Sequence, residues 1–226
     1  MNAENSLFEQ LKGTCSEDWK RYTHHDFVAR IADGTLPKRA FRHYLIQDYL
    51  FLIQFARAYA LAVYKSDTLA DMRQAGAGMS AILDTEMTLH VAFCQKWGLS
   101  EADMETAPEG SACMAYTRFV LERGMSGDLL DLHIALAPCI VGYAEIGARL
   151  ASNSVTLTEG NPYTPWIEMY ASAEYQDVAA DEINFLEDLM TRRAGPGRFN
   201  SLADTFGKAA RLEIDFWQMG LDHAGL

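Results

Sequence analysis

Apolar residues recur every three or four positions through almost the whole chain. This spacing matches the turn of an α-helix, and no stretch of four to eight alternating residues stands out between turn signals. The pattern therefore predicts an all-α fold. We expect eight helical segments, some of them kinked, near residues 4–22, 24–32, 37–65, 68–97, 109–125, 128–151, 162–193 and 201–222.

The length of 226 residues suits one large domain, so we expect a single domain over residues 1–226. The longest piece without a helical pattern runs from Ser152 to Pro165. Composition does not change on either side of it, which favours a surface loop over a linker. We find no internal repeat and no sustained heptad pattern, which argues against solenoids and coiled coils.

The formal net charge of −12 argues against nucleic acid or an anionic membrane as a partner. We see no apolar run that approaches the roughly 20 residues of a membrane span. The first five residues, Met1 to Asn5, lack the features of a signal peptide. We therefore expect a cytoplasmic protein with reduced thiols at its four widely spaced cysteines, Cys15, Cys94, Cys113 and Cys139.

One carboxylate interrupts an apolar helix face. Asp48 lies in the middle of a stripe that runs from Phe41 to Tyr59 at spacings of three and four. A carboxylate that faces a core is costly unless it is paired or hydrogen-bonded, and it often marks a site for a polar ligand. The alternative is a solvated or capped aspartate.

Cys139 follows Pro138 inside a helical pattern that also contains Tyr143 on the same face. A proline inside a helix removes a hydrogen bond and costs about 3 kcal/mol. A kink at Pro138 would release the carbonyl of Ile134 and could turn the Cys139 side chain toward a cavity, although a harmless bend is equally allowed.

Glu213 lies on an apolar stripe of the last segment, next to Phe216 and Trp217. Burial against these rings would raise its pKa and suit it to exchange protons near neutral pH. A structural ion pair is the alternative. A nucleophile and two carboxylates on helix faces that point to one bundle interior together favour an active site.

A metal site is the competing interpretation for Glu86 and His90, which lie four residues apart on one helix face. A second set of ligands is needed, and no E-x-x-H motif occurs in the chain, so we favour a structural hydrogen bond for His90 and predict no metal. Gly76 and Gly78 lack the lysine ending of a phosphate loop and instead indicate a close approach of two helices.

Four local motifs resemble the TenA/thiaminase II proteins, and the resemblance extends along nearly the whole chain. They are Asp33-Gly34-Thr35-Leu36-Pro37 leading into Phe41 and Tyr44 to Leu50, the run from Glu86 to His90, Ala137-Pro138-Cys139 with Tyr143 and Glu145-Ile146-Gly147, and Glu213 before Phe216-Trp217.

The resemblance implies a haem-oxygenase-like helical bundle without haem, usually a homotetramer, that hydrolyses aminopyrimidine breakdown products of thiamin. It implies no metal or organic cofactor. Carried over by position, Cys139 is the nucleophile, Glu213 the acid and base, and Asp48 the carboxylate that grips the pyrimidine. The expected pocket residues are Phe51, Tyr116, Tyr143 and Tyr170.

The chain departs from this family at Phe51, where many members have a tyrosine, so a hydroxyl is lost from the expected pocket. Two other functions stay open at this stage. One is a haem-oxygenase-like, metal-dependent oxidase that would use Glu86 and His90. The other is a non-catalytic regulator that binds a pyrimidine.

Overall fold

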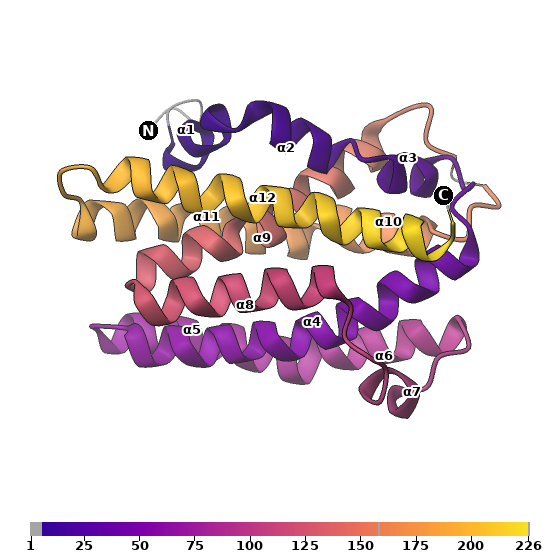
Figure 1. Cartoon of the computed structure of the whole chain (residues 1–226), viewed down its shortest axis with the longest axis horizontal. Coiled ribbons are helices and arrows are strands. Elements are labelled where there is room, and N and C mark those ends of the chain that lie inside the picture. The colour runs from indigo at the N-terminus through magenta and orange to yellow at the C-terminus, as the bar shows by residue number, and fades with distance from the viewer. Residues whose placement is uncertain (1–5, 158, 226) are drawn as a thin grey trace. The chain divides into compact units, whose positions relative to one another are not determined.

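The computed structural model describes residues 6–157 and 159–225 (Figure 1). These residues form helices joined by turns and include no β-strand, which confirms the all-α prediction. Met1 to Asn5 lie outside the described residues. They include residues 4 and 5 of the first expected segment and the stretch that was expected to lack signal-peptide features.

The described residues divide into two compact units. One contains the chain up to Leu36 and from His133 to Gln218, and is called the Cys139 unit below. The other contains Pro37 to Leu132 and the chain from Met219 onward, and is called the Asp48 unit. A single domain over residues 1–226 stays a prediction.

The Asp48 unit is built on one long helix, α4 (Lys38–Lys65). Within this unit, α4 packs against the five elements α5 (Leu69–Ser80), the π-helix η2 (Ala81–Glu86), α6 (Met87–Lys96), α7 (Glu101–Glu105) and α8 (Ser111–Ser126). Gly78 on α5 allows the closest approach, because a Cβ there would lie 2.4 Å from the Tyr59 ring. The predicted close helix contact is confirmed for Gly78, whereas a Cβ at Gly76 would meet nothing within 4 Å.

The Cys139 unit contains five complete helices: α1 (Leu7–Thr14), α2 (Ser16–Thr23), α3 (Asp26–Ala32), α10 (Thr164–Ala171) and α11 (Ala173–Arg193). Two further helices, α9 (Leu129–Ser152) and α12 (Arg198–His223), each have most of their residues in this unit. The expected loop after Ser152 joins α9 to α10, and the Asn161 amide holds it by donating to the carbonyls of Ile31 and Leu157 at 2.8 and 2.9 Å. Both ends of the loop belong to one unit, as expected for a surface loop.

The expectation of eight helices was wrong, because several segments break without glycine or proline. The first segment breaks at Cys15, and the segment 162–193 breaks at Ser172, whose backbone is extended at φ −62° and ψ 151°. The short helix α7 was missed, and α12 begins at Arg198 rather than near Ser201. In the expected segment 68–97, a π-helical turn separates α5 from α6.

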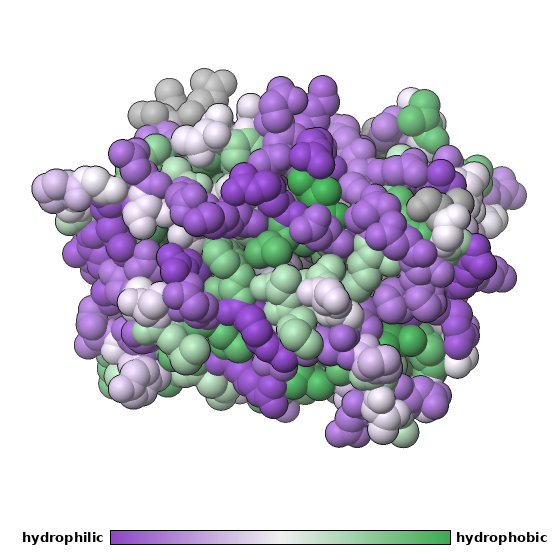
Figure 2. Space-filling view, in the orientation of Figure 1, coloured by the Kyte–Doolittle hydropathy of each residue, from purple (hydrophilic) through white to green (hydrophobic). Residues whose placement is uncertain are grey.

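The expectation that no apolar run approaches the length of a membrane span was wrong for helix α9. It has 24 residues and contains an 18-residue window with mean hydropathy 1.5, so length and composition alone would allow it to cross a membrane. However, 89% of that window is buried inside the protein, as is usual for a core helix. Hydrophilic side chains cover much of the face drawn in Figure 2.

Candidate active site

Asp48 is a buried carboxylate on α4, as the stripe in the sequence predicts. The Tyr44 side chain, one helical turn earlier, is hydrogen-bonded to it, and Nδ1 of His90 lies 3.4 Å from its Oδ2. Burial raises the pKa of Asp48, while the charge of His90 and the hydrogen bond from Tyr44 act in the opposite direction. The alternative of a solvated aspartate is therefore wrong.

Glu86, on the π-helix η2, and His90, in the first turn of α6, both interact electrostatically with Asp48. Nε2 of His90 lies 2.9 Å from the carbonyl oxygen of Leu45, so the predicted structural hydrogen bond of His90 is present. Burial raises the pKa of Glu86, and the negative charge of Asp48 raises it further. Over the described residues, we find no group of three His, Cys, Asp or Glu side chains arranged to hold one metal ion.

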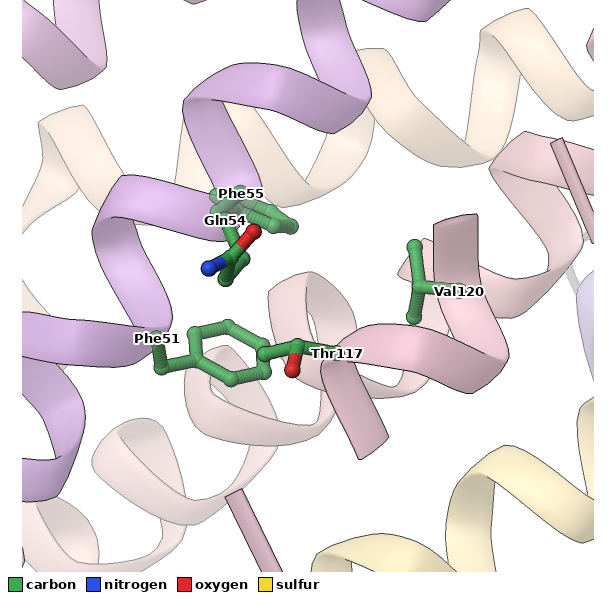
Figure 3. A pocket seen from close by; sticks show the side chains of 5 residues that line it. All are labelled: Phe51, Gln54, Phe55, Thr117 and Val120. Carbon is green, nitrogen blue, oxygen red and sulfur yellow. The ribbon is translucent and has the colours of Figure 1, made fainter. Parts of the chain in front are cut away.

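Phe51 and Tyr116 form an aromatic contact within the Asp48 unit, with ring centroids 5.3 Å apart. Phe51 also lines a small hollow between α4 and α8 (Figure 3). Its lining is mostly apolar and consists of Phe51, Gln54, Phe55, Thr117 and Val120. Sequence reasoning did not single out Gln54 or Thr117, because a lone polar residue on a half-buried helix face carries no specific signal.

Cys139 lies inside α9 directly after Pro138, and its side chain is half-buried. The Tyr22 hydroxyl donates a hydrogen bond of 3.2 Å to the carbonyl of Pro138, which belongs to the peptide bond that leads into Cys139. Gly142 makes room for this tyrosine, because a Cβ there would lie 2.3 Å from the Tyr22 ring. Local sequence and packing therefore together fix the backbone at the cysteine.

The other three cysteines have thiols with raised pKa values. Cys94 and Cys113 are fully buried, and burial raises the pKa of Cys94 to about 12 and that of Cys113 further still. Burial also raises the pKa of Cys15, with a smaller contribution from the charge of Asp18. These thiols are poor nucleophiles near neutral pH, because the thiolate is the reactive form.

Aromatic rings surround Tyr143, which lies one turn after Cys139 on α9. Its ring centroid is 4.9 Å from Tyr170, 5.1 Å from Trp217 and 6.0 Å from Trp166. The sequence pointed to Tyr143 and Tyr170, but it did not point to Trp166. The sequence did contain a signal for Trp166, because it precedes Tyr170 by four residues, which is about one helical turn. In the structure both lie on the short helix α10, and their ring centroids are 4.7 Å apart.

Glu213 is buried in α12 with 1% of its surface exposed, one turn before Trp217. The predicted burial of this acid is confirmed, and its role as acid and base stays a prediction. The residues predicted from sequence therefore form two groups. Asp48, Phe51 and Tyr116 belong to the Asp48 unit, and Cys139, Tyr143, Tyr170 and Glu213 belong to the Cys139 unit.

Comparison with known proteins gives the family. The chain matches the TENA/THI-4/PQQC family over residues 15–223 and belongs to it. It is 42% identical over 218 residues to an uncharacterized protein of Haemophilus influenzae, covering 96% of this chain and 100% of that one. It is 34% identical over 220 residues to an aminopyrimidine aminohydrolase of Halalkalibacterium halodurans, covering 97% of this chain and 95% of that one.

A longer protein contains a segment similar to this chain. It is a hydroxymethylpyrimidine/phosphomethylpyrimidine kinase of Saccharomyces cerevisiae, 30% identical over 207 residues that cover 91% of this chain and 37% of the kinase.

Solved structures agree with this assignment. A TenA family transcription regulator from Silicibacter sp. TM1040 superposes with a TM-score of 0.90 at 43% identity, covering 95% of this chain and 96% of that one. A domain with a haem oxygenase-like fold from Shewanella denitrificans has a TM-score of 0.73 at 12% identity, covering 97% and 94%. The second similarity concerns the fold alone. The expected TenA resemblance and haem-oxygenase-like fold are confirmed.

Proposed function

We propose that this protein is an aminopyrimidine aminohydrolase of the thiaminase II type that acts in thiamin salvage. Its substrate is 4-amino-5-aminomethyl-2-methylpyrimidine, and its products are the hydroxymethyl-pyrimidine and ammonia. The match to a named aminopyrimidine aminohydrolase over 97% of this chain supports the activity. The match to part of a kinase named for hydroxymethylpyrimidine supports the product, because that compound would be its next substrate.

The observation that carries the proposal is the setting of Cys139, the one expected nucleophile. Its thiol is half-buried, it follows a proline inside a core helix, and the Tyr22 hydroxyl holds the preceding carbonyl. Nucleophilic catalysis requires an accessible sulfur in a fixed position. The net charge of −12 favours this enzyme over a nucleic-acid-binding regulator.

The chemistry assigns each remaining residue a role. The Cys139 thiolate adds to the pyrimidine and forms a carbon–sulfur bond, and Glu213 supplies the proton with which the amine leaves. Water then adds at the exocyclic carbon that the amine left and gives a proton to the Glu213 carboxylate, and the Cys139 thiolate leaves the ring, which restores aromaticity and gives the hydroxymethyl product. Asp48 binds the ring and its amino group, and aromatic side chains exclude water from the ring. These are Phe51, Tyr116, Tyr143 and Tyr170.

The proposal extends to assembly and location. We propose a cytoplasmic homotetramer of a single-domain chain, on the basis of the family resemblance. Light scattering on the purified protein would then give four times the chain mass of 25.2 kDa. A mass of one or two chains would contradict the tetramer and leave the proposed activity unaffected.

The activity is tested by incubating the purified protein with 4-amino-5-aminomethyl-2-methylpyrimidine, and separately with thiamin, and detecting the hydroxymethyl-pyrimidine by chromatography. We expect product from the parent chain and none from Cys139→Ser. Cys15→Ser is the matched control, since Cys15 is also half-buried, and it should keep the parent rate.

The ratio of rates on the two substrates distinguishes a salvage hydrolase from a thiaminase. Full activity in Cys139→Ser would refute the nucleophile. Binding of the pyrimidine without product from either substrate would refute the hydrolase and favour a pyrimidine-binding regulator.

A further inference from the structure

His90 contacts Asp48 in a way that constrains their protons. Nδ1 of His90 lies 3.4 Å from Oδ2 of Asp48, and the two side chains are 9% and 13% exposed. Nε2, on the opposite side of the imidazole, lies 2.9 Å from the carbonyl oxygen of Leu45. Leu45 and Asp48 are three residues apart on α4, so one surface of this helix contacts both nitrogens of the ring.

These two contacts determine how many protons the pair carries. A carbonyl oxygen only accepts hydrogen bonds, so Nε2 of His90 must carry a hydrogen. In a neutral imidazole, Nδ1 then has a lone pair, and this nitrogen lies 3.4 Å from the Asp48 oxygen. Two acceptors repel each other at a site with little water, so one proton belongs to the pair. It forms either an imidazolium with a carboxylate or an imidazole with a carboxylic acid.

Neighbouring groups whose pKa values are raised bring no charge to the pair. The Tyr44 side chain is hydrogen-bonded to Asp48. Burial, and then the charge of Asp48, raise the pKa of Glu86, which favours its neutral form. The thiols of Cys94 and Cys113 also have raised pKa values, mainly through burial, and stay neutral.

One more ring lies beside His90. The Tyr49 centroid is 6.4 Å from the imidazole, and the Tyr49 hydroxyl donates to Glu101 at 3.4 Å. Burial and the charge of Glu101 raise the pKa of Tyr49, so this side chain brings no charge to the imidazole.

The element that carries Glu86 is also unusual, since η2 is a π-helix and such turns are frequent at functional sites.

We propose that His90 is a positioning residue for the proposed reaction: it shares one proton with Asp48, and the pair gives that proton to the pyrimidine ring on binding. The inference rests on the proposed function, because a 4-aminopyrimidine places an N–H donor beside a ring nitrogen that can accept a proton. Asp48 accepts from the amino group through one oxygen and serves the ring nitrogen through the other.

An N–H or O–H bond of the pair breaks, and an N–H bond forms at the ring nitrogen. The ring gains one positive charge, and the pair is left as a carboxylate with a neutral imidazole. A positively charged ring is the better acceptor for the Cys139 thiolate. The proton returns to the pair when the product leaves.

The ultraviolet absorbance of the bound pyrimidine tests the inference without turnover, because protonation of the ring changes its spectrum. The probe is 4-amino-5-hydroxymethyl-2-methylpyrimidine bound to the Cys139→Ser chain, at a pH at which the free probe is neutral. We expect the spectrum of a protonated ring. In the double variant with His90→Asn we expect the neutral ring, because an amide can donate a hydrogen bond to Asp48 but holds no acidic proton.

A pH profile of turnover gives a second measurement on chains that keep Cys139. We expect His90→Asn to lower kcat/KM by about 100-fold above neutral pH and by less at lower pH, where solvent supplies the ring proton. His24→Asn, at an exposed position, is the matched control and should change neither the spectrum nor the profile. His90→Gln, whose longer amide can keep the contact with Leu45, is the second variant if His90→Asn does not fold.

A protonated ring in the His90 variants, or an equal loss of kcat/KM at every pH, would overturn the role of His90. A neutral ring bound to the Cys139→Ser chain with His90 intact would do the same. Failure of the parent chain to bind the pyrimidine at all would refute the proposed function itself, and the two failures are therefore distinguishable.

Discussion

Replacing Gly147 with alanine tests how closely α10 approaches the helix that carries Cys139. A Cβ at Gly147 would lie 2.4 Å from the carbonyl carbon of Tyr170, 2.6 Å from its carbonyl oxygen and 2.7 Å from the nitrogen of Ala171. Ordinary contact begins at 3.4 Å, so the end of α10 has to move by about 1 Å. All three atoms belong to the backbone, and no side-chain rotation can relieve the clash.

Two contributions of opposite sign set the expected change in the free energy of unfolding. Alanine is favoured over glycine by about 1 kcal/mol inside a helix, whereas overpacking costs about 1–3 kcal/mol. Gly76→Ala on α5 is the matched control, because a Cβ there meets nothing within 4 Å. Both variants gain the helix propensity, so the difference between them isolates the clash. We expect Gly147→Ala to be the less stable of the two by about 1–3 kcal/mol.

Thermal unfolding followed by circular dichroism measures this difference. For a chain of this size, each kcal/mol changes Tm by about 2–4 °C. The same displacement moves Tyr170, so we also expect a higher KM for the pyrimidine in Gly147→Ala and an unchanged KM in Gly76→Ala. Equal Tm values for the two alanine variants would refute the close approach of α10 at Gly147.

Three further perturbations test other contacts. Glu182→Ala removes the carboxylate 2.9 Å from Nδ1 of buried His133, and urea titration should show a loss of about 3 kcal/mol. Asp188→Ala, in an exposed pair on the same helix, should cost less than about 1 kcal/mol, and similar losses would contradict the difference. Phe51→Tyr adds a hydroxyl beside the hollow, so the ratio of kcat/KM for thiamin and the aminomethyl compound should change by about tenfold; an unchanged ratio argues against a role in leaving-group preference. Burial, and then the charge of stacked His223, lower the pKa of His43 from 6.5 to about 4. Stability from neutral His43 is therefore present above pH 6.5 and lost as the pH falls toward 4. His43→Gln should flatten this decline in urea titrations at several pH values, and a decline as steep as that of the parent chain would count against the assignment.

Helix content was predictable because the apolar period persists over long segments, but the breaks between short helices were not. At Ser172 the helix is interrupted by one extended residue, whose hydroxyl accepts from the Tyr175 amide at 3.2 Å and starts α11. No glycine or proline marks that break. The missed helix α7 carried a readable signal, since Ser100 and Asp103 form a capping box, but five residues are too few to show a period.

The candidate residues were predictable one at a time, whereas their partners were not. The position of Asp48 on an apolar stripe indicates a buried carboxylate that needs partners, and one of them, His90, is 42 positions later in the chain. Likewise, the cost of Pro138 indicates a special site, but the Tyr22 hydroxyl that contacts its carbonyl is 116 positions away. Periodicity is a local property, so it shows where a partner is needed and not which residue supplies it.

The irregular residues of this chain share one physical consequence. A buried carboxylate and a proline inside a helix each lower stability unless neighbouring groups compensate. At Asp48 the compensation comes from hydrogen bonding to Tyr44 and the contact with His90, and beside Pro138 the Tyr22 hydroxyl adds a hydrogen bond to the carbonyl that precedes Cys139. Each compensating group also fixes the orientation of the residue that it stabilises. The contacts that make these residues tolerable in a helical core are therefore the same ones that would hold a carboxylate and a thiol still for chemistry.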